Sequence, residues 1–288
     1  MSALAPPPPA AVPVGPGAGR TGPRPTGGSA APRPAARRRG VRLGWLRRWV
    51  SPVVIVLVWQ LLSSAGVIPE QKIASPLQVL ATARDLVADG TLGSATLVSV
   101  QRVGLGFAVG AAIGVTLAVA AGLSRLGEDA VDPPMQMLRT LPHFGLIPLF
   151  IVWMGLGETP KIALVAMGVM FPLYLNTFAG IRSIDRRFLE AATTLHLTRW
   201  QRIRHVVVPG AVPQALVGLR QSLGVAWLSL IVAETVSASS GLGYMINHAR
   251  EFLQTDVIVV GLAVYSILGL VTDAIVRTLE RKALSWRP

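Results

Sequence analysis

The sequence contains no cysteine, and only 14% of its 288 residues are charged. The lack of cysteine excludes a disulfide framework, a thiolate zinc site and a cysteine nucleophile. The scarcity of charge excludes an ordinary soluble domain, in which about a quarter of the residues are charged. Hydrophobic residues make up 51% of the chain and its mean hydropathy is +0.54. A membrane is therefore the expected solvent.

Motifs for catalysis are also missing. There is no GxxxxGK[ST] loop to hold ATP phosphates and no GxSxG elbow around any serine. The histidines fall in different predicted segments without the spacing of metal ligands; they are His143, His196, His205 and His248. We expect no catalytic residue, cofactor or metal on this chain, which is therefore not an enzyme, and any use of ATP must depend on a partner.

Basic side chains outnumber acidic ones by 27 to 14, for a formal charge of +13. Such an excess could indicate nucleic-acid binding, because basic faces release counterions from phosphates. The arginines, however, are gathered in two regions: nine precede the first apolar segment and six lie between Arg182 and Arg204. This pattern is typical of the positive-inside bias of membrane proteins. We expect a lipid bilayer as the partner of this surface and no nucleic acid.

The first 44 residues are rich in proline, alanine, glycine and arginine. Such a segment cannot bury enough apolar area to offset its chain entropy, and repeated prolines block a helix. A secretory signal would need a short basic region directly before its apolar core, which this long prefix does not provide. The composition predicts a disordered cytoplasmic tail over 1–44 and a membrane domain over 45–288.

Apolar segments long enough to cross a bilayer, which takes about 20 residues, recur through the membrane domain. The sequence predicts an all-α polytopic membrane protein with six transmembrane helices, near 50–68, 100–122, 134–155, 160–181, 214–236 and 257–278. An even number places both termini on one side, and the arginine-rich regions place that side in the cytoplasm. A short interfacial helix is predicted after Ser75, and Gly106, Gly110 and Gly114 form a small-residue stripe suited to close helix packing.

The polar segment over about 183–212 is too polar to span and too regular to be a simple linker. Apolar residues recur at spacings of three or four from Leu189 to Val207, which predicts two short amphipathic helices with a turn between them. Pro209 and Pro213 then allow the next span to begin. The small residues Ala191 and Ala192 suggest a knob that fits a groove on a partner, although a plain surface loop would also fit the pattern.

This loop resembles the signature of the permease subunits of ABC importers, which is Glu-Ala-Ala, three residues, Gly, nine residues, Ile, one residue and Leu-Pro. The matching or substituted positions here are Glu190, Ala191, Ala192, His196, Val206, Val208 and Pro209. The resemblance implies that the loop couples the permease to an ATPase. Glycine permits a left-handed turn that histidine tolerates less well, so the turn at His196 is where this chain departs from the pattern.

The resemblance covers nearly all of residues 45–287 and is strongest to the sulfonate, nitrate and taurine permeases. It is carried by stretches such as "QMLRTLPHFGLIPLFIVWMGLG", "GLRQSLGVAWLSLIVAETVSASSGLGYMINHAREFLQTDVI" and "LERKALSW". It implies a multi-pass protein of the bacterial cytoplasmic membrane that translocates a small anion, aliphatic sulfonate before nitrate or taurine. It also implies a second copy of the chain, two ATPase subunits that hold ATP and magnesium, and an extracytoplasmic substrate-binding protein.

An ion-coupled secondary transporter is the alternative from another class. Such carriers often show inverted repeats and buried carboxylates, whereas this chain shows no repeat and only Glu234 and Asp273 as acidic candidates near the spans. Polar residues inside membrane spans usually face protein or water. The candidates for the substrate path are Arg139, His143, Asn176, Arg220 and Glu234. Each also has a structural reading, because the arginines could snorkel to the interface, Asn176 could bond a neighbouring helix, and Glu234 could bond backbone or line an outer gate.

Overall fold

The computed structural model describes residues 43–69 and 72–285, and all regular structure within these ranges is helical. Contacts divide the chain into two units, Met1–Arg48 and Trp49–Pro288, and every interaction discussed below lies within the second. The tail predicted for 1–44 lies outside the described residues except for its last two positions, which begin the first helix.

The helices follow the expected order along the chain. Those with the bulk of the apolar sequence are α1 (Leu43–Ser64), α3 (Thr91–Leu123), α6 (Glu158–Arg182), α9 (Val208–Ser237) and α11 (Thr255–Ala283). The shorter elements are α2 (Pro76–Ala88), α4 (Arg125–Leu138), the 3-10 turn η1 (His143–Leu146), α5 (Ile147–Met154), α7 (Arg186–Thr194), α8 (Arg199–Arg202), the π-helical turn η2 (Ile203–Val207) and α10 (Leu242–Glu251).

The predicted helix after Ser75 is confirmed as α2. The Ser75 side chain accepts a hydrogen bond from the Gln78 amide at 3.3 Å, and Pro76 occupies the first turn, where it costs no hydrogen bond. Gly90 then turns the chain in a left-handed conformation, φ +80°, before α3 begins. This conformation suits glycine because a Cβ would strain it.

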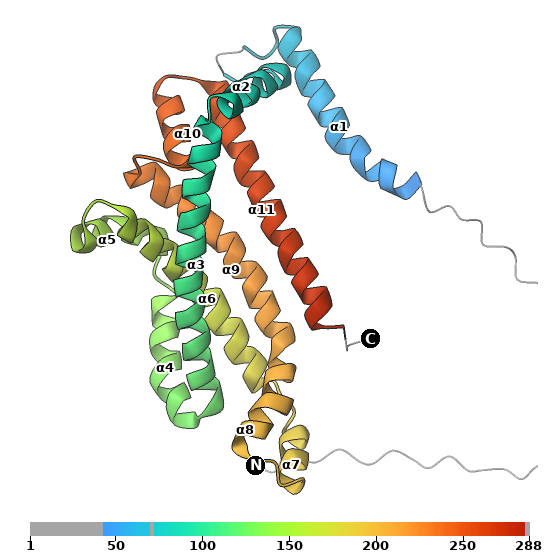
Figure 1. Cartoon of the computed structure of the whole chain (residues 1–288), viewed down its shortest axis with the longest axis vertical. Coiled ribbons are helices and arrows are strands. Elements are labelled where there is room, and N and C mark those ends of the chain that lie inside the picture. The colour runs from blue at the N-terminus through green and yellow to red at the C-terminus, as the bar shows by residue number, and fades with distance from the viewer. Residues whose placement is uncertain (1–42, 70–71, 286–288) are drawn as a thin grey trace, which may run out of the picture. The chain divides into compact units, whose positions relative to one another are not determined.

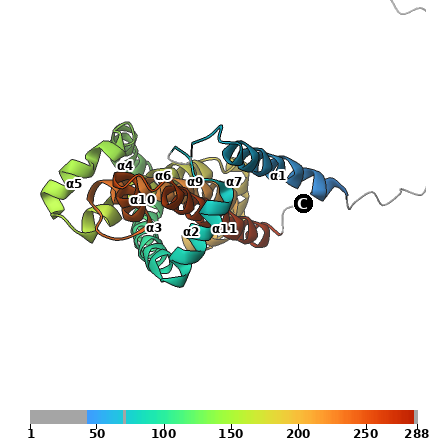
Figure 2. The same cartoon turned by 90° about the horizontal axis from the view of Figure 1, so that it is seen from above.

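Helices α3, α6 and α9 lie side by side in both views, with α4 and α5 on the side away from α11 (Figures 1 and 2). The predicted glycine stripe lies between α3 and α6. A Cβ added at Gly110 would lie 2.2 Å from the Ala166 carbonyl oxygen, and one at Gly114 would lie 2.6 Å from that of Met170. The stripe therefore allows backbone-to-backbone packing, as small residues do in membrane helices.

Within the described residues, four helices are long and apolar enough to cross a membrane by themselves: α3, α6, the continuous run from α8 through α9, and α11. The described apolar part of α1, Val50–Ser64, is shorter. Side chains of α11 such as Ile267 and Leu270 are more than half exposed, as expected of a lipid-facing helix. The described residues thus support a multi-pass membrane protein with four such spans, or five if the bent pair of α4 with η1 and α5 counts as one, and the prediction of six spans is not confirmed.

The predicted span over 134–155 is not a continuous helix. Its residues belong to α4, η1 and α5, and the axes on the two sides of the break differ by 83°. Pro142 stands at the break; it lacks an N–H group to continue the helix and disfavours helical geometry at the residue before it. The average hydropathy of this segment indicated a span but could not reveal the break.

Candidate functional site

The polar loop between α6 and α9 forms the two predicted short helices, α7 and α8, with a turn between them, and residues 185–209 are called the elbow below. Asp185 caps α7 by accepting the Arg187 amide at 2.9 Å, and Thr198 and Gln201 form a reciprocal capping box at the start of α8. Between them the backbone of His196 is left-handed, with φ +53°. The elbow is therefore two short helices held by local hydrogen bonds on each side of one tight turn.

The turn at His196 keeps the geometry that glycine would favour. The His196 amide donates to the Thr193 carbonyl at 2.9 Å, and the Leu197 amide donates to the Ala192 carbonyl at 3.0 Å. This pair of bonds is the Schellman arrangement that closes many helices. Histidine in place of glycine therefore leaves the turn intact, but its backbone is strained because it adopts a left-handed conformation.

Side chains of the elbow divide into an inner and an outer set. Ala192 and Val207 are buried, whereas Glu190, Ala191 and Val208 are exposed. The exposed set includes large apolar side chains, with Phe188 at 65%, Leu195 at 73% and Trp200 at 69% exposure. Exposed aromatic and aliphatic side chains close together are typical of a protein contact surface.

Glu190 also lines a surface hollow of about 470 Å³. The other lining residues are Arg186, Leu189, Thr193, Thr194 and Arg202. The hollow thus combines one carboxylate with two guanidinium groups. Together with the apolar side chains beside it, it offers both the charge and the shape that a docking surface needs.

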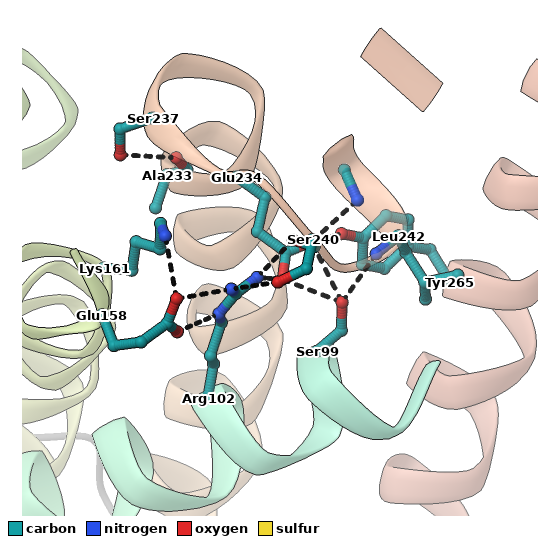
Figure 3. Close-up of polar contacts among 11 residues, drawn as sticks. Ser99, Arg102, Glu158, Lys161, Ala233, Glu234, Ser237, Ser240, Leu242 and Tyr265 are labelled. Carbon is teal, nitrogen blue, oxygen red and sulfur yellow. Dashed lines mark hydrogen bonds and ion pairs between the residues drawn. The ribbon is translucent and has the colours of Figure 1, made fainter. Parts of the chain in front are cut away.

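At the opposite end of the bundle, near α10, the structure contains an ionic network in which Arg102, Lys161 and Glu234 are buried and Glu158 is exposed (Figure 3). Arg102 on α3 is 2% exposed and forms ion pairs with Glu158 on α6 and Glu234 on α9. Its guanidinium also donates to the backbone carbonyl and hydroxyl of Ser240, at 2.7 and 3.0 Å. Lys161 adds a second cation, 3.0 Å from Glu158. Two cations and two carboxylates therefore balance one another where isolated charges would be costly.

The Glu234 carboxylate collects hydrogen bonds from several helices. It accepts the Ser99 hydroxyl at 2.8 Å, the Gly243 amide at 2.7 Å and the Tyr265 hydroxyl at 2.9 Å. A Cβ at Gly243 would lie 2.5 Å from the Glu234 side chain, so only glycine allows α10 this close. The network therefore joins α3, α6, α9, α10 and α11 at one end of the bundle.

The predicted path residues do not converge on one site. Glu234 lies in the ionic network, Arg139 is exposed directly after α4, and His143 begins η1. Arg220 pairs with Asp273 and Glu280 of α11.

Asn176 belongs to a cluster of amides. It donates to Gln221 at 3.0 Å and accepts from Gln214 at 2.8 Å, which joins α6 to α9. Both glutamines are exposed on this chain. An amide cluster is polar but uncharged, and it offers hydrogen-bond donors on the surface of membrane helices.

Sequence reasoning identified Glu234 but missed its ion-pair partner Arg102, and it missed Glu158 and Lys161, which extend the network from Arg102. Arg102 lies inside the predicted second span, and a charged residue within an apolar segment indicates that an oppositely charged side chain lies nearby. That partner could not be identified, because Glu234 is 132 residues away along the chain.

Comparison with known proteins identifies the architecture. Residues 110–285 match the family described as binding-protein-dependent transport system inner membrane component. The chain belongs to this family. Its members are permease subunits of ABC importers, which work with an ATPase and a substrate-binding protein, and ATP hydrolysis resides on a separate subunit.

Individual relatives agree with this assignment. An aliphatic sulfonates transport permease protein of Escherichia coli (strain K12) is 47% identical over 85% of this chain and 94% of its own. Its counterpart in Bacillus subtilis (strain 168) is 43% identical over 85% and 89%. A solved amino acid ABC transporter has the same fold over 69% of this chain and 97% of its own, with a TM-score of 0.58 at 18% identity. The chain is thus an ABC importer permease of the cytoplasmic membrane.

Proposed function

We propose that the chain is the permease of an aliphatic sulfonate importer. The observation that carries this proposal is the gradient of identity: 43% and 47% to two aliphatic sulfonates permeases, against 32% to a taurine permease of Escherichia coli and 29% to a nitrate permease of Synechocystis. Nitrate and taurine are the alternative cargoes within the same family.

The cargo is tested in proteoliposomes that contain the permease, its ATPase and its binding protein. Labelled ethanesulfonate is supplied with an excess of unlabelled alkanesulfonate, taurine or nitrate. Strong competition by alkanesulfonate and weak competition by the other two anions is the expected result. If nitrate, at the same excess as the alkanesulfonate, competed completely with ethanesulfonate, the importer would be assigned to nitrate instead.

The elbow at Glu190 is proposed as the docking site for the ATPase, which holds ATP and magnesium, while this chain carries no cofactor. The exposed Phe188, Leu195 and Trp200 supply apolar contact area, and Glu190 supplies a charge beside them. We expect Glu190→Lys and Ala191→Trp to abolish coupling between ATP hydrolysis and uptake without preventing membrane insertion.

A matched control is available at the other end of the bundle. Glu251 is an exposed glutamate in the last turn of α10, far along the chain from the elbow. Glu251→Lys makes the same charge change and should leave ATPase stimulation and uptake near wild type. If Glu190→Lys and Glu251→Lys behave alike, docking at the elbow is contradicted.

A second copy of the chain is proposed to cover the amide cluster of Asn176, Gln214 and Gln221. Lipid cannot satisfy exposed amides, so such groups in membrane helices face protein or water. A path for anions along this face would be lined by neutral donors, with Arg139, His143 and Arg220 as further candidates and Glu234 near the outer end. We place the elbow and both termini in the cytoplasm, because the arginines of the elbow follow the positive-inside rule.

The natural absence of cysteine makes this interface directly testable. We expect Gln214→Cys to cross-link two copies, since it lies on the proposed shared face. Leu270→Cys on the exposed face of α11 is the control and should not cross-link. Equal cross-linking at both positions would argue against this interface. Labelling of the same cysteines from one side of the membrane reports the orientation.

A further inference from the structure

The break between α4 and η1 lies partway along the length of the bundle and not at one of its ends. Helix α4 has 14 residues and runs back beside the 33-residue α3. At 1.5 Å per residue, the break is about 21 Å from the turn that joins α3 to α4, along a helix about 50 Å long. Residues 139–142 at the break are exposed on this chain. Backbone outside a helix at this depth is tolerated only where other protein or a water-filled cavity covers it.

Two buried polar atoms without hydrogen-bond partners lie near each other beside the break. The Nε2 atom of His143 and the Oγ atom of Ser229 are both buried, and neither has a hydrogen-bond partner among the described residues. A Cβ at Gly168 would lie 2.5 Å from Ser229 Oγ and 3.5 Å from His143 Nε2. The two atoms are therefore no more than 6.0 Å apart, the total of those two distances. One oxygen atom placed between them can accept a hydrogen bond from each.

Ser229 differs in this respect from another buried serine of the same helix. Ser222 lies two turns earlier on α9 and is equally buried, but its hydroxyl donates to the Leu219 carbonyl at 3.0 Å. A helical serine can satisfy itself in this way without any ligand. The Ser229 hydroxyl does not, and its side chain is 0% exposed. Buried polar groups without partners are rare in proteins, and each one calls for a physical reason.

We propose that His143 and Ser229 form a binding position for one oxygen of the transported oxyanion, beside the close approach of α6 to α9 that Gly168 allows. The proposal rests on the proposed function of sulfonate import. The hydroxyl and the imidazole N–H both donate hydrogen bonds, which suits the charge that a sulfonate spreads over three oxygens. Neither group carries a fixed charge, so the anion is held weakly enough to move on.

The break gives this position a means of opening and closing. His143 is attached to the non-helical segment 139–142, whereas Ser229 is fixed in the middle of α9 and Gly168 in the middle of α6. Rotation about the break would move the imidazole relative to Ser229, and it would also separate Ile147, which follows η1, from its buried neighbours Leu164 and Ala233. The binding position can therefore be assembled in one transport state and dispersed in another.

The test compares Ser229→Ala with Ser222→Ala in the reconstituted complex of permease, ATPase and binding protein. Loss of the contact should lower the ethanesulfonate uptake rate about tenfold, the effect of losing one hydrogen bond to a charged group. Ser222→Ala removes an equally buried hydroxyl that already has a partner, and should stay within about twofold of wild type. Equal uptake by the two variants would overturn the proposal, and absence of uptake by the wild type would instead overturn sulfonate import.

A second measurement separates substrate contact from a structural role. The complex is prepared with isotope-labelled histidine, and the His143 nitrogen signal is assigned by its loss in His143→Gln. Ethanesulfonate should shift this signal in the wild type and in Ser222→Ala but not in Ser229→Ala or Gly168→Ala. An absent shift in the wild type, or an equal shift with chloride at the same ionic strength, would overturn the proposal even if the Ser229 variant were poorly folded.

Discussion

Replacement of Arg102 by glutamine should destabilise the permease far more than the same change at Arg182. Both arginines lie in long apolar helices and pair with glutamate, Arg102 with Glu158 and Glu234, and Arg182 with Glu128. The Arg102 side chain is 3% exposed and that of Arg182 is 43% exposed. Removing one member of a buried ion pair costs about 3–5 kcal/mol, and here Glu234, whose side chain is 0% exposed, would stay buried without its cation. An exposed pair contributes about 0–1 kcal/mol.

The difference is measured as thermal unfolding in detergent. At about 2–4 °C per kcal/mol for a chain of this size, Arg102→Gln should lower the midpoint by roughly 6–20 °C. Arg182→Gln should lower it by less than about 4 °C. If the two variants melted within about 2 °C of one another, the network would not be holding this end of the bundle together, and the reasoning from burial would be refuted.

Two further pairs of substitutions test backbone geometry by the same thermal unfolding assay. His196→Gly should raise the free energy of unfolding by about 0.5–1 kcal/mol because it relieves the strain of the left-handed backbone. His196→Pro should unfold the elbow, because it removes the amide that donates to Thr193 and fixes φ at a negative value. Equal stability of the two variants would contradict the observed turn. Gly110→Ala should lower the free energy of unfolding by about 1–3 kcal/mol, because the added Cβ would clash with the Ala166 carbonyl. Gly104→Ala in the same helix is the control: its Cβ would have nothing within 4 Å, so it should be neutral or stabilising by up to about 1 kcal/mol. Equal effects at the two glycines would argue against the close packing of α3 on α6.

The long helices could be located from the sequence because a span must be apolar over a nearly fixed length. The spans predicted over 160–181, 214–236 and 257–278 fall within α6, α9 and α11. The prediction over 134–155 failed in its geometry, because hydropathy is averaged over a window and is insensitive to one proline at the point where the helix must stop.

The elbow was predictable because its signals are local. Caps, helical periodicity and the turn position lie within a few residues of one another, from Asp185 to Pro209. The conformation of His196 was the part that sequence left undecided, since a histidine adopts a positive φ only when the surrounding hydrogen bonds hold it there.

The polar groups inside the bundle could be found from the sequence but not paired. Arg102 and Glu158 are 56 residues apart, and the two unpaired polar atoms near the break, His143 Nε2 and Ser229 Oγ, come from η1 and α9. Such contacts depend on how the helices cross, which no local pattern records. The structure was needed to show that Glu234 forms an ion pair with Arg102 and that the Ser229 hydroxyl has no hydrogen-bond partner among the described residues.

The most direct test of the account is the energy source of uptake in proteoliposomes that hold this permease, its ATPase and its binding protein. We predict that ethanesulfonate accumulates when ATP and magnesium are present on the ATPase side, and that accumulation stops when either the ATPase or the binding protein is omitted. Uptake by the permease alone, driven by a proton or sodium gradient and indifferent to ATP, would contradict the account and would assign the chain to the ion-coupled carriers.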